Sequence, residues 1–279
     1  MSGSLRELVL SIALPDSGTD VARDLATFRS IWRSLGVQNP GVLRDVRSVL
    51  CLSLCPCQFK AAVSSEVALT APPGTPILHL SGESWGRCFN DAFLYAVACD
   101  GARFWVHMDD EHVCVRPFWN SARSVLGGGG APGAHLWQLQ VSDDWDDLPS
   151  ERMIHGDGFT EMVPYANPEA RAEYDPEEDC ADEEPFLSMW PVFSLRPSVM
   201  KLHHFRAAVA SGALAARPFD EESGWATLQW RLGVILESLG GRKGVLNPPA
   251  FFARPPGEGD GVSTEEAAWD SYGEEEDED

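Results

Sequence analysis

The sequence predicts an α+β protein with a mixed α/β-sheet domain, an acidic linker, a helical C-terminal module and a disordered acidic tail. Strand-like apolar runs gather before residue 142, two runs with helical spacing follow residue 186, and acidic residues gather in two segments. The expected boundaries are 1–142 for the α+β domain, 143–185 for the linker, 186–254 for the helical module and 255–279 for the tail.

The N-terminal part begins with a continuous apolar run at residues 8–14, which predicts a buried strand. Thr19 or Asp20 is expected to cap a helix whose apolar residues recur at helical spacing. Gly36, a common residue at helix C-termini, is expected to end it. Residues 48–59 predict a second buried strand.

Between residues 63 and 141 the chain has short apolar runs separated by turn residues, which predict further strands. These strands are expected at 63–69, 77–80, 102–107, 113–118 and 136–141. Residues 89–98 fit either a strand or a helix. The acidic triplet Asp109-Asp110-Glu111 is expected to connect two strands of a hairpin, and helices are expected at about 197–214 and 220–239.

The formal net charge of −22 is concentrated in two segments. Residues 143–184 contain 16 acidic and 2 basic residues, and residues 258–279 contain 11 acidic and no basic residues. The tail repels itself and has few apolar groups to bury, which predicts disorder. Nucleic-acid binding is disfavoured, because it depends on Lys and Arg that neutralise phosphates.

No stretch approaches the roughly 18 uninterrupted apolar residues that a membrane helix requires. The seven cysteines do not have the spacing of a small disulfide-stabilised domain. We therefore expect no membrane segment, and thiols that are reduced in the cytosol or nucleus.

Two sets of residues suggest chemistry, and we expect a structural role for both. The first set is Cys51, Cys55 and Cys57, which lack the paired spacing of a zinc site. The second is Cys88, His107 and Asp109, which suggest a thiol nucleophile with a base and an orienting group but lack a nucleophile signature. The sequence thus predicts no catalytic residue, no metal site and no cofactor.

The most informative segment runs from Thr227 to Leu239, with Gly240-Gly241 ending the expected helix. Its apolar residues share one helical face: Trp225, Leu228, Leu232, Ile235, Leu236 and Leu239. Such a stripe fits a core helix or a helix that docks in the groove of a partner.

The order of a Thr-Leu pair and two aliphatic residues at intervals of four resembles the elongin-binding box of cullin ubiquitin-ligase receptors, such as the von Hippel-Lindau and SOCS-box proteins. The resemblance implies an elongin-binding set, Thr227, Leu228, Leu232, Leu236 and Leu239. The downstream residues Leu246, Pro248 and Pro249 are similar to the segment that selects the cullin in those receptors.

Arg outnumbers Lys by 18 to 3, as is typical of a GC-rich genome. Together with the acidic tail and the box, this composition resembles the Gam-like early proteins of fowl adenoviruses. The resemblance implies a viral substrate receptor, with no enzymatic activity, in the host nucleus and cytoplasm. Such a receptor would bring elongin B/C and a cullin to a host target such as the SUMO-activating enzyme, and so derepress transcription.

An alternative without the box is a direct-binding inhibitor or immunity-type protein that neutralises a basic partner through its acidic surface. A hydrolase or metal enzyme is the third possibility, and the sequence shows no convergent acid-base pair for it.

Overall fold

The computed structural model describes residues 6–15, 20–54, 57–127, 135–142, 153–162, 193–222 and 225–254, without the side chains of residues 225–227 and 230. Most of the expected linker and the whole expected tail, 255–279, lie outside the described residues, so the predicted disorder of the tail is not tested.

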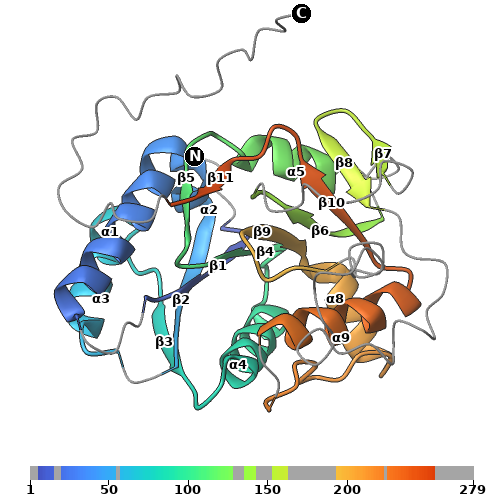
Figure 1. The fold of residues 1–279 in the computed structure, drawn as a ribbon, viewed down its shortest axis with the longest axis horizontal. Helices are drawn as coiled ribbons and strands as arrows, with labels where there is room; N and C mark the ends of the chain where they lie inside the picture. The colour runs from blue at the N-terminus through green and yellow to red at the C-terminus, as the bar shows by residue number, and fades with distance from the viewer. Residues whose placement is uncertain are drawn as a thin grey trace, which may run out of the picture.

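A mixed sheet of nine strands forms the centre of the fold, in the order β3-β2-β1-β4-β9-β6-β10-β8-β7 (Figure 1). The strands are β1 (Leu8–Ala13), β2 (Val46–Ser53), β3 (Ile77–Ser81), β4 (Phe104–Met108), β6 (Leu136–Gln140), β7 (Met153–His155), β8 (Phe159–Met162), β9 (Ser198–Lys201) and β10 (Arg242–Leu246). The strands β3, β2, β1 and β4 are parallel, and β9 runs antiparallel between β4 and β6. A separate antiparallel pair consists of β5 (His112–Cys114) and β11 (Phe251–Ala253).

Helices cover both faces of the sheet, as in a doubly wound α/β fold (Figure 1). One face carries α1 (Val21–Gln38), α2 (Pro40–Asp45), α3 (Lys60–Thr70) and α5 (Trp119–Gly127). The other face carries α4 (Trp85–Ala98), α8 (Leu202–Ala210) and α9 (Trp225–Ser238). None of the helices in the described ranges is long and apolar enough to cross a membrane.

The strand β1 shows why this sequence forms the centre of such a sheet. Its six residues are all buried, and alternate side chains enter the two cores. Leu8, Leu10 and Ile12 lie on the face of the sheet that α1 covers, whereas Val9 and Ser11 lie on the face that α4 covers. A strand covered on both faces requires a continuous apolar run, and the prediction of a buried strand at residues 8–14 is confirmed.

The helix expected after this strand is also confirmed. The side chain of Asp20 accepts a hydrogen bond from the backbone N–H of Arg23 and caps α1. Phe28, Trp32 and Leu35 bury the apolar face of α1. The helix passes Gly36 and ends at Gln38, two residues later than expected.

Several other expectations were wrong because apolar runs of this length suit both helices and strands. Residues 63–69 belong to helix α3, and 197–214 begin with strand β9 before α8. Residues 89–98, for which both alternatives were open, lie in helix α4. The acidic triplet does not close a hairpin, because β4 pairs with β1 and β9 while β5 pairs with β11.

The predicted fold class, α+β with a separate helical C-terminal module, was also wrong. Strands β9 and β10 come from residues 186–254, the range expected to form the helical module, and they lie inside the large sheet. Strands β7 and β8 come from the expected linker. The protein therefore has a doubly wound α/β architecture, in which α8 and α9 cover one face of the sheet.

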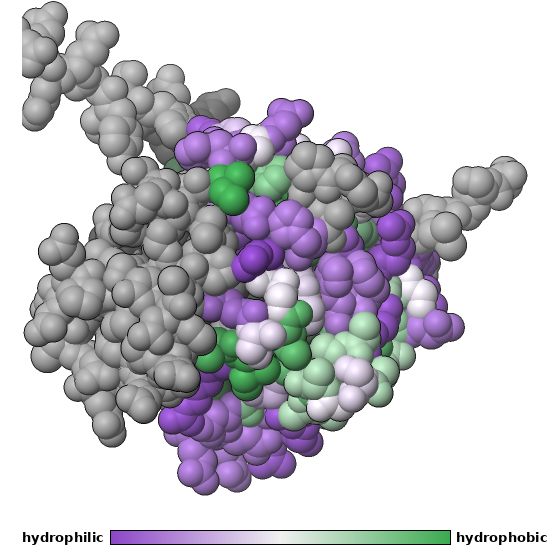
Figure 2. All heavy atoms as spheres, turned by 90° about the vertical axis from the view of Figure 1, so that its right-hand side faces the viewer, coloured by the Kyte–Doolittle hydropathy of each residue, from purple (hydrophilic) through white to green (hydrophobic). Residues whose placement is uncertain are grey.

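The apolar stripe of α9 faces this core. Leu228, Leu232 and Leu236 are 1%, 1% and 2% exposed, and Leu239 packs against the same cluster. On the side of the molecule where α8 and α9 lie, the described surface is a mixture of hydrophilic areas and smaller apolar ones (Figure 2). The helix thus contributes its leucines to the interior of this fold.

Candidate functional site

The order of the parallel strands defines a crevice at one edge of the sheet. The chain passes from β1 to β2 and β3 on one side and then returns to β4 on the other side of β1. Helix α1 lies on one face and α4 on the opposite face. Open α/β sheets bind ligands outside the carboxyl ends of the strands at such a reversal, here between β1 and β4.

The acidic triplet Asp109-Asp110-Glu111 lies at this crevice, because it directly follows the last residue of β4. Asp109 is buried, with 2% exposure, whereas the side chain of Glu111 is 63% exposed. Ligand atoms of Asp109, Glu111 and His112 all lie within 4.8 Å of one another. The topology therefore brings three consecutive carboxyl groups to the edge where ligands bind in this class of fold.

Asp109 is held in one orientation by its neighbours. Its Oδ1 accepts hydrogen bonds from the backbone N–H groups of Glu111 and His112, at 3.2 and 3.1 Å. The Nδ1 atom of His112 lies 2.9 Å from both carboxylate oxygens of Asp109. His112 is itself fixed on β5, which pairs with β11. A carboxylate fixed in this way is pre-organised to bind a ligand.

Asp110 is the perturbed member of the triplet. Burial raises the pKa of its carboxyl group from 3.8 to about 6, with a smaller contribution from the adjacent negative charges of Asp109 and Glu111. Arg254 opposes this shift. A carboxyl group with a raised pKa at a crevice is a typical feature of functional sites, because a positive ligand relieves the unfavourable charge.

The other side of the triplet is formed by residues far away in the sequence. Arg196, which precedes β9, makes an ion pair with Glu111, and its Nη1 lies 3.7 Å from Oδ2 of Asp109. The backbone N–H of Arg254, which follows β11, donates to the carbonyl of Glu111 at 2.9 Å. The C-terminal third of the chain thus completes the crevice.

The thiol site considered from the sequence is not assembled. The Sγ of Cys88 donates to the carbonyl of Ser53 at 3.3 Å, and Nδ1 of His107 lies 2.9 Å from the hydroxyl of Ser11. Burial lowers the pKa of His107 to about 4 and raises that of Cys88, so the environment disfavours an imidazolium-thiolate pair. Both side chains act as parts of the core around α4.

The residues of the elongin-box resemblance are not at this site. Leu228, Leu232 and Leu236 are core residues, and the side chain of Thr227 lies outside the described part of the chain. Leu246 is buried at the end of β10, while Pro248 is exposed and Pro249 half-buried in the turn before β11. The peptide bond between Asn247 and Pro248 is cis.

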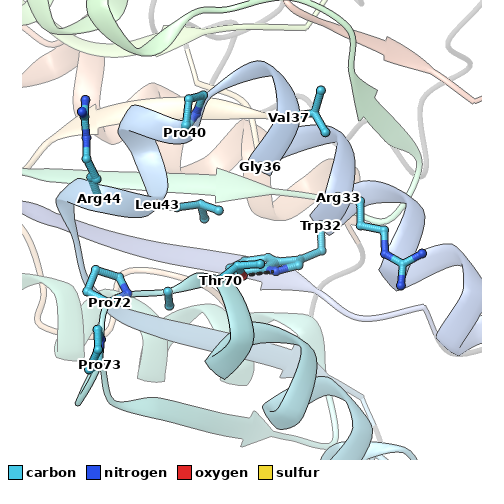
Figure 3. A pocket seen from close by; sticks show the side chains of 11 residues that line it. Trp32, Arg33, Gly36, Val37, Pro40, Leu43, Arg44, Thr70, Pro72 and Pro73 are labelled. Carbon is cyan, nitrogen blue, oxygen red and sulfur yellow. Dashed lines mark hydrogen bonds between the residues drawn. The ribbon is translucent and has the colours of Figure 1, made fainter.

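A cavity of about 710 Å³ lies elsewhere, between the C-terminal ends of α1 and α3 and the start of α2 (Figure 3). Trp32 lies at its base, where its indole N–H donates to the hydroxyl of Thr70 at 2.8 Å. Pro40, Pro72 and Arg44 contribute to its walls. Helices α1 and α3 end at the edge of the sheet where the parallel strands begin, whereas the acidic triplet lies at the edge where they end. The cavity and the triplet therefore lie at opposite edges of the sheet.

The chain was compared with known proteins in sequence and in structure. No protein-family model matches the sequence, and a search of the curated proteins found no match. Residues 1–349 of S. aureus TarS, a glycosyltransferase, have a similar structure, with a TM-score of 0.51 and 12% identity. The similarity covers 88% of this chain and 60% of that one, so this chain spans less than two thirds of the TarS segment.

Two further structures are similar to a lower degree. The same S. aureus TarS segment in complex with UDP has a TM-score of 0.49, 12% identity, and coverage of 88% of this chain and 60% of that one. The 4-diphosphocytidyl-2C-methyl-D-erythritol synthase of Anaerococcus prevotii has a TM-score of 0.43, 8% identity, and coverage of 89% and 90%. At these identities, a likeness concerns the fold alone.

These findings correct the functional expectations. The resemblance to Gam-like early proteins was wrong, because the chain has a doubly wound α/β fold that is similar to that of TarS. The prediction of a ubiquitin-ligase adaptor without enzymatic activity was wrong for the same reason, and its apolar helix is part of the core. The alternative of a direct-binding inhibitor or immunity-type protein is not supported either.

Proposed function

We propose that this protein is a glycosyltransferase that uses a nucleoside diphosphate sugar as donor and binds its diphosphate through a divalent cation at Asp109-Asp110-Glu111. The observation that carries the proposal is the acidic triplet at the carboxyl end of β4, beside the reversal of strand order. The fold shared with the glycosyltransferase TarS supports it.

The residues of the crevice suit a hard divalent cation. Mg²⁺ and Mn²⁺ prefer carboxylate oxygens, and they often bind through one or two carboxylates together with substrate phosphates. The carboxylates of Asp109 and Glu111 are close enough to share one ion after a small adjustment. Burial, with a smaller contribution from the negative charges of Asp109 and Glu111, raises the pKa of Asp110, and a nearby cation would favour its charged form.

The bound cation would neutralise negative charge that develops on the diphosphate as it leaves. In glycosyl transfer, the bond between the anomeric carbon and the diphosphate oxygen breaks, and a bond forms between that carbon and an acceptor oxygen. The nucleoside diphosphate keeps the bonding electron pair, and the proton of the acceptor hydroxyl passes to solvent.

The contribution of the chain itself is orientation. The hydrogen bonds from His112 and from two backbone N–H groups hold Asp109, so little reorganisation is needed when the donor binds. Arg196, which precedes β9, and Arg254, which follows β11, contact the triplet at Glu111, and Arg254 in turn connects it to Thr27 of helix α1.

The proposal is tested by binding and turnover. Calorimetry of the full chain with UDP, GDP, CDP and ADP, with and without Mn²⁺, should show nucleotide binding that requires the cation. A panel of sugar nucleotides should then release a nucleoside diphosphate. Release of pyrophosphate from nucleoside triphosphates would instead indicate nucleotidyl transfer and would overturn the proposal.

Substitutions locate the binding to the triplet. Asp109→Asn and Glu111→Gln should each weaken cation-dependent nucleotide binding by about tenfold or more, because each removes a charged ligand. Glu111 is exposed, so its variant is expected to fold even if the Asp109 variant does not. Asp157→Asn, at an exposed acid between β7 and β8, is the matched control. Unchanged binding by folded Glu111→Gln and Asp109→Asn variants would contradict the proposal.

A further inference from the structure

Arg196 places a positive charge where the proposed function requires a cation. Its guanidinium group makes an ion pair with Glu111, and its Nη1 lies 3.7 Å from Oδ2 of Asp109. The side chain is 33% exposed, so it lies at the surface of the crevice and not beneath it. The guanidinium therefore interacts with the two carboxylates that the divalent cation would use.

The backbone beside Arg196 is fixed by two buried amides. The Oε1 of Gln138, on β6, accepts the N–H of Ser194 at 2.9 Å. The Oε1 of Gln229, on α9, accepts the N–H of Leu195 at 2.8 Å. The two glutamines are 1% and 5% exposed, and a buried amide without such partners would be costly.

This arrangement separates a fixed main chain from a long side chain that can turn. Arginine has several rotatable bonds between its backbone and its charged group, so the guanidinium can move by several ångströms while the backbone stays in place. The two glutamines are positioning residues in this arrangement, because they act on the crevice through Arg196. Gln229 also gives α9 a connection to the site that its apolar stripe does not reveal.

Charge determines where the guanidinium lies. The triplet has three consecutive carboxyl groups, and Arg254, the other nearby arginine, directs its own guanidinium to the hydroxyl of Thr27 at 2.8 Å. A divalent cation at the triplet would repel Arg196 and replace its charge there. The diphosphate brought by that cation is then the adjacent anion, and guanidinium groups bind phosphate with two parallel hydrogen bonds.

We propose that Arg196 occupies the cation position in the ligand-free protein and moves to the diphosphate when a divalent cation binds. The inference rests on the proposed function and adds a competition that the function alone does not require. Before binding, Arg196 offsets part of the negative charge of the triplet. After binding, it holds the leaving diphosphate.

The competition predicts two effects of opposite sign for Arg196→Met. This variant keeps an apolar stem of similar length and removes the charge. Its affinity for Mn²⁺ alone should increase about tenfold, because the competing cation is gone, and the affinity of the Mn²⁺-saturated protein for UDP, GDP, CDP and ADP should fall about tenfold. If Arg196 had only a structural role, its substitution would not raise the affinity for Mn²⁺.

The experiment is calorimetric titration of the full-length wild type and variant, first with Mn²⁺ and then with each nucleoside diphosphate at saturating Mn²⁺. Arg242→Met is the matched control. Arg242, at the start of β10, is 37% exposed, and its Nε lies 3.7 Å from a carboxylate oxygen of Glu161. This control should bind both ligands as the wild type does.

The outcomes separate the inference from the proposed function. Equal Mn²⁺ affinity in wild type and Arg196→Met, with nucleotide binding retained, overturns the competition and leaves the proposed function standing. If Arg196→Met binds Mn²⁺ more tightly but neither the wild type nor the variant binds any nucleoside diphosphate, the proposed function and the movement of Arg196 to the diphosphate are both overturned. Opposite changes in the two affinities support the whole inference.

Discussion

Asp110→Asn should make the ligand-free protein more stable while weakening its binding of Mn²⁺. Burial raises the pKa of Asp110 to about 6, which means that the fold favours the protonated, neutral side chain over the charged one. Asparagine has the same shape without the charge. The substitution therefore removes an unfavourable interaction of the empty site and, at the same time, a negative charge that the cation would use.

The magnitude follows from the pKa difference. The interval from the ordinary value of 3.8 to about 6 corresponds to about 3 kcal/mol of unfavourable free energy when the carboxyl group is fully ionised. Because the folded-state pKa is the higher one, this cost is fully present above pH 6 and disappears as the pH falls from about 6 to 3.8. The variant should thus gain at most about 3 kcal/mol at pH 7.5 and much less at pH 4.5.

Urea unfolding followed by tryptophan fluorescence measures this difference, with Asp157→Asn as a control for the loss of one exposed acid. The free energy of unfolding should rise for Asp110→Asn at pH 7.5, and the gap from the wild type should narrow at pH 4.5. Calorimetry at pH 7.5 should show weaker Mn²⁺ binding by the same variant. A variant that is less stable than the wild type at pH 7.5, or equally shifted at both pH values, would refute the assignment of Asp110 as a destabilised carboxyl group.

Two further predictions concern the packing that supports the crevice, and chemical denaturation measures both. Gly86→Ala should destabilise the protein by about 2 kcal/mol or more, because a Cβ at this position of α4 would lie 2.0 Å from the carbonyl oxygen of Asp220. The control is Gly127→Ala, which should have little effect, because nothing in the described structure lies within 4 Å of the added Cβ. Equal effects of the two substitutions would contradict this account. Leu232→Ala should lower the free energy of unfolding by about 2–5 kcal/mol, because the Leu232 side chain is 1% exposed in the core. Ile235→Ala, in the same helix and at a side chain that is 38% exposed, should lower it much less. A small loss of stability for Leu232→Ala would show that α9 is not packed as described.

The sequence predicted local elements well where one pattern excluded others. The continuous apolar run at residues 8–14 predicted a buried strand, and Asp20 was one of the two residues expected to cap α1. It failed at 63–69, where Val63 and Val67 are four residues apart and belong to one face of a helix, although the segment is apolar enough for a strand. Helix and strand propensities overlap in such short runs, and the packing of the segment in the assembled fold determines which structure forms.

The order of the strands was beyond local pattern. Strand β9 lies between β4 and β6 although it follows β6 by more than fifty residues in the sequence, and β10 lies next to β6 from the far end of the chain. Pairings over such separations depend on the burial of both faces at once. The expected helical C-terminal module failed for this reason, since β9 and β10 are short strands that gain their partners only in the assembled sheet.

The acidic triplet was visible in the sequence, but its meaning depended on the neighbours of β4. A hairpin turn and a ligand crevice both place Asp109-Asp110-Glu111 after an apolar strand, and acidic residues are common in turns. The signal that distinguishes them is the alternation of strands and helices from β1 to β4, which predicts parallel strands with aligned carboxyl ends. Recognising residues 63–69 and 89–98 as helices would have completed that alternation.

Helix α9 shows why a motif of spaced leucines cannot by itself assign a docking surface. The period that presents Leu228, Leu232 and Leu236 to a partner is the period that presents them to a sheet, so both alternatives fit the same residues. The polar residue between them carries the distinguishing information. A helix that docks outward has no need to bury Gln229, whereas here its amide is 5% exposed and accepts the N–H of Leu195 beside Arg196. One buried polar contact therefore connects α9 to the acidic crevice, and it makes the helix part of the structure that supports the proposed active site.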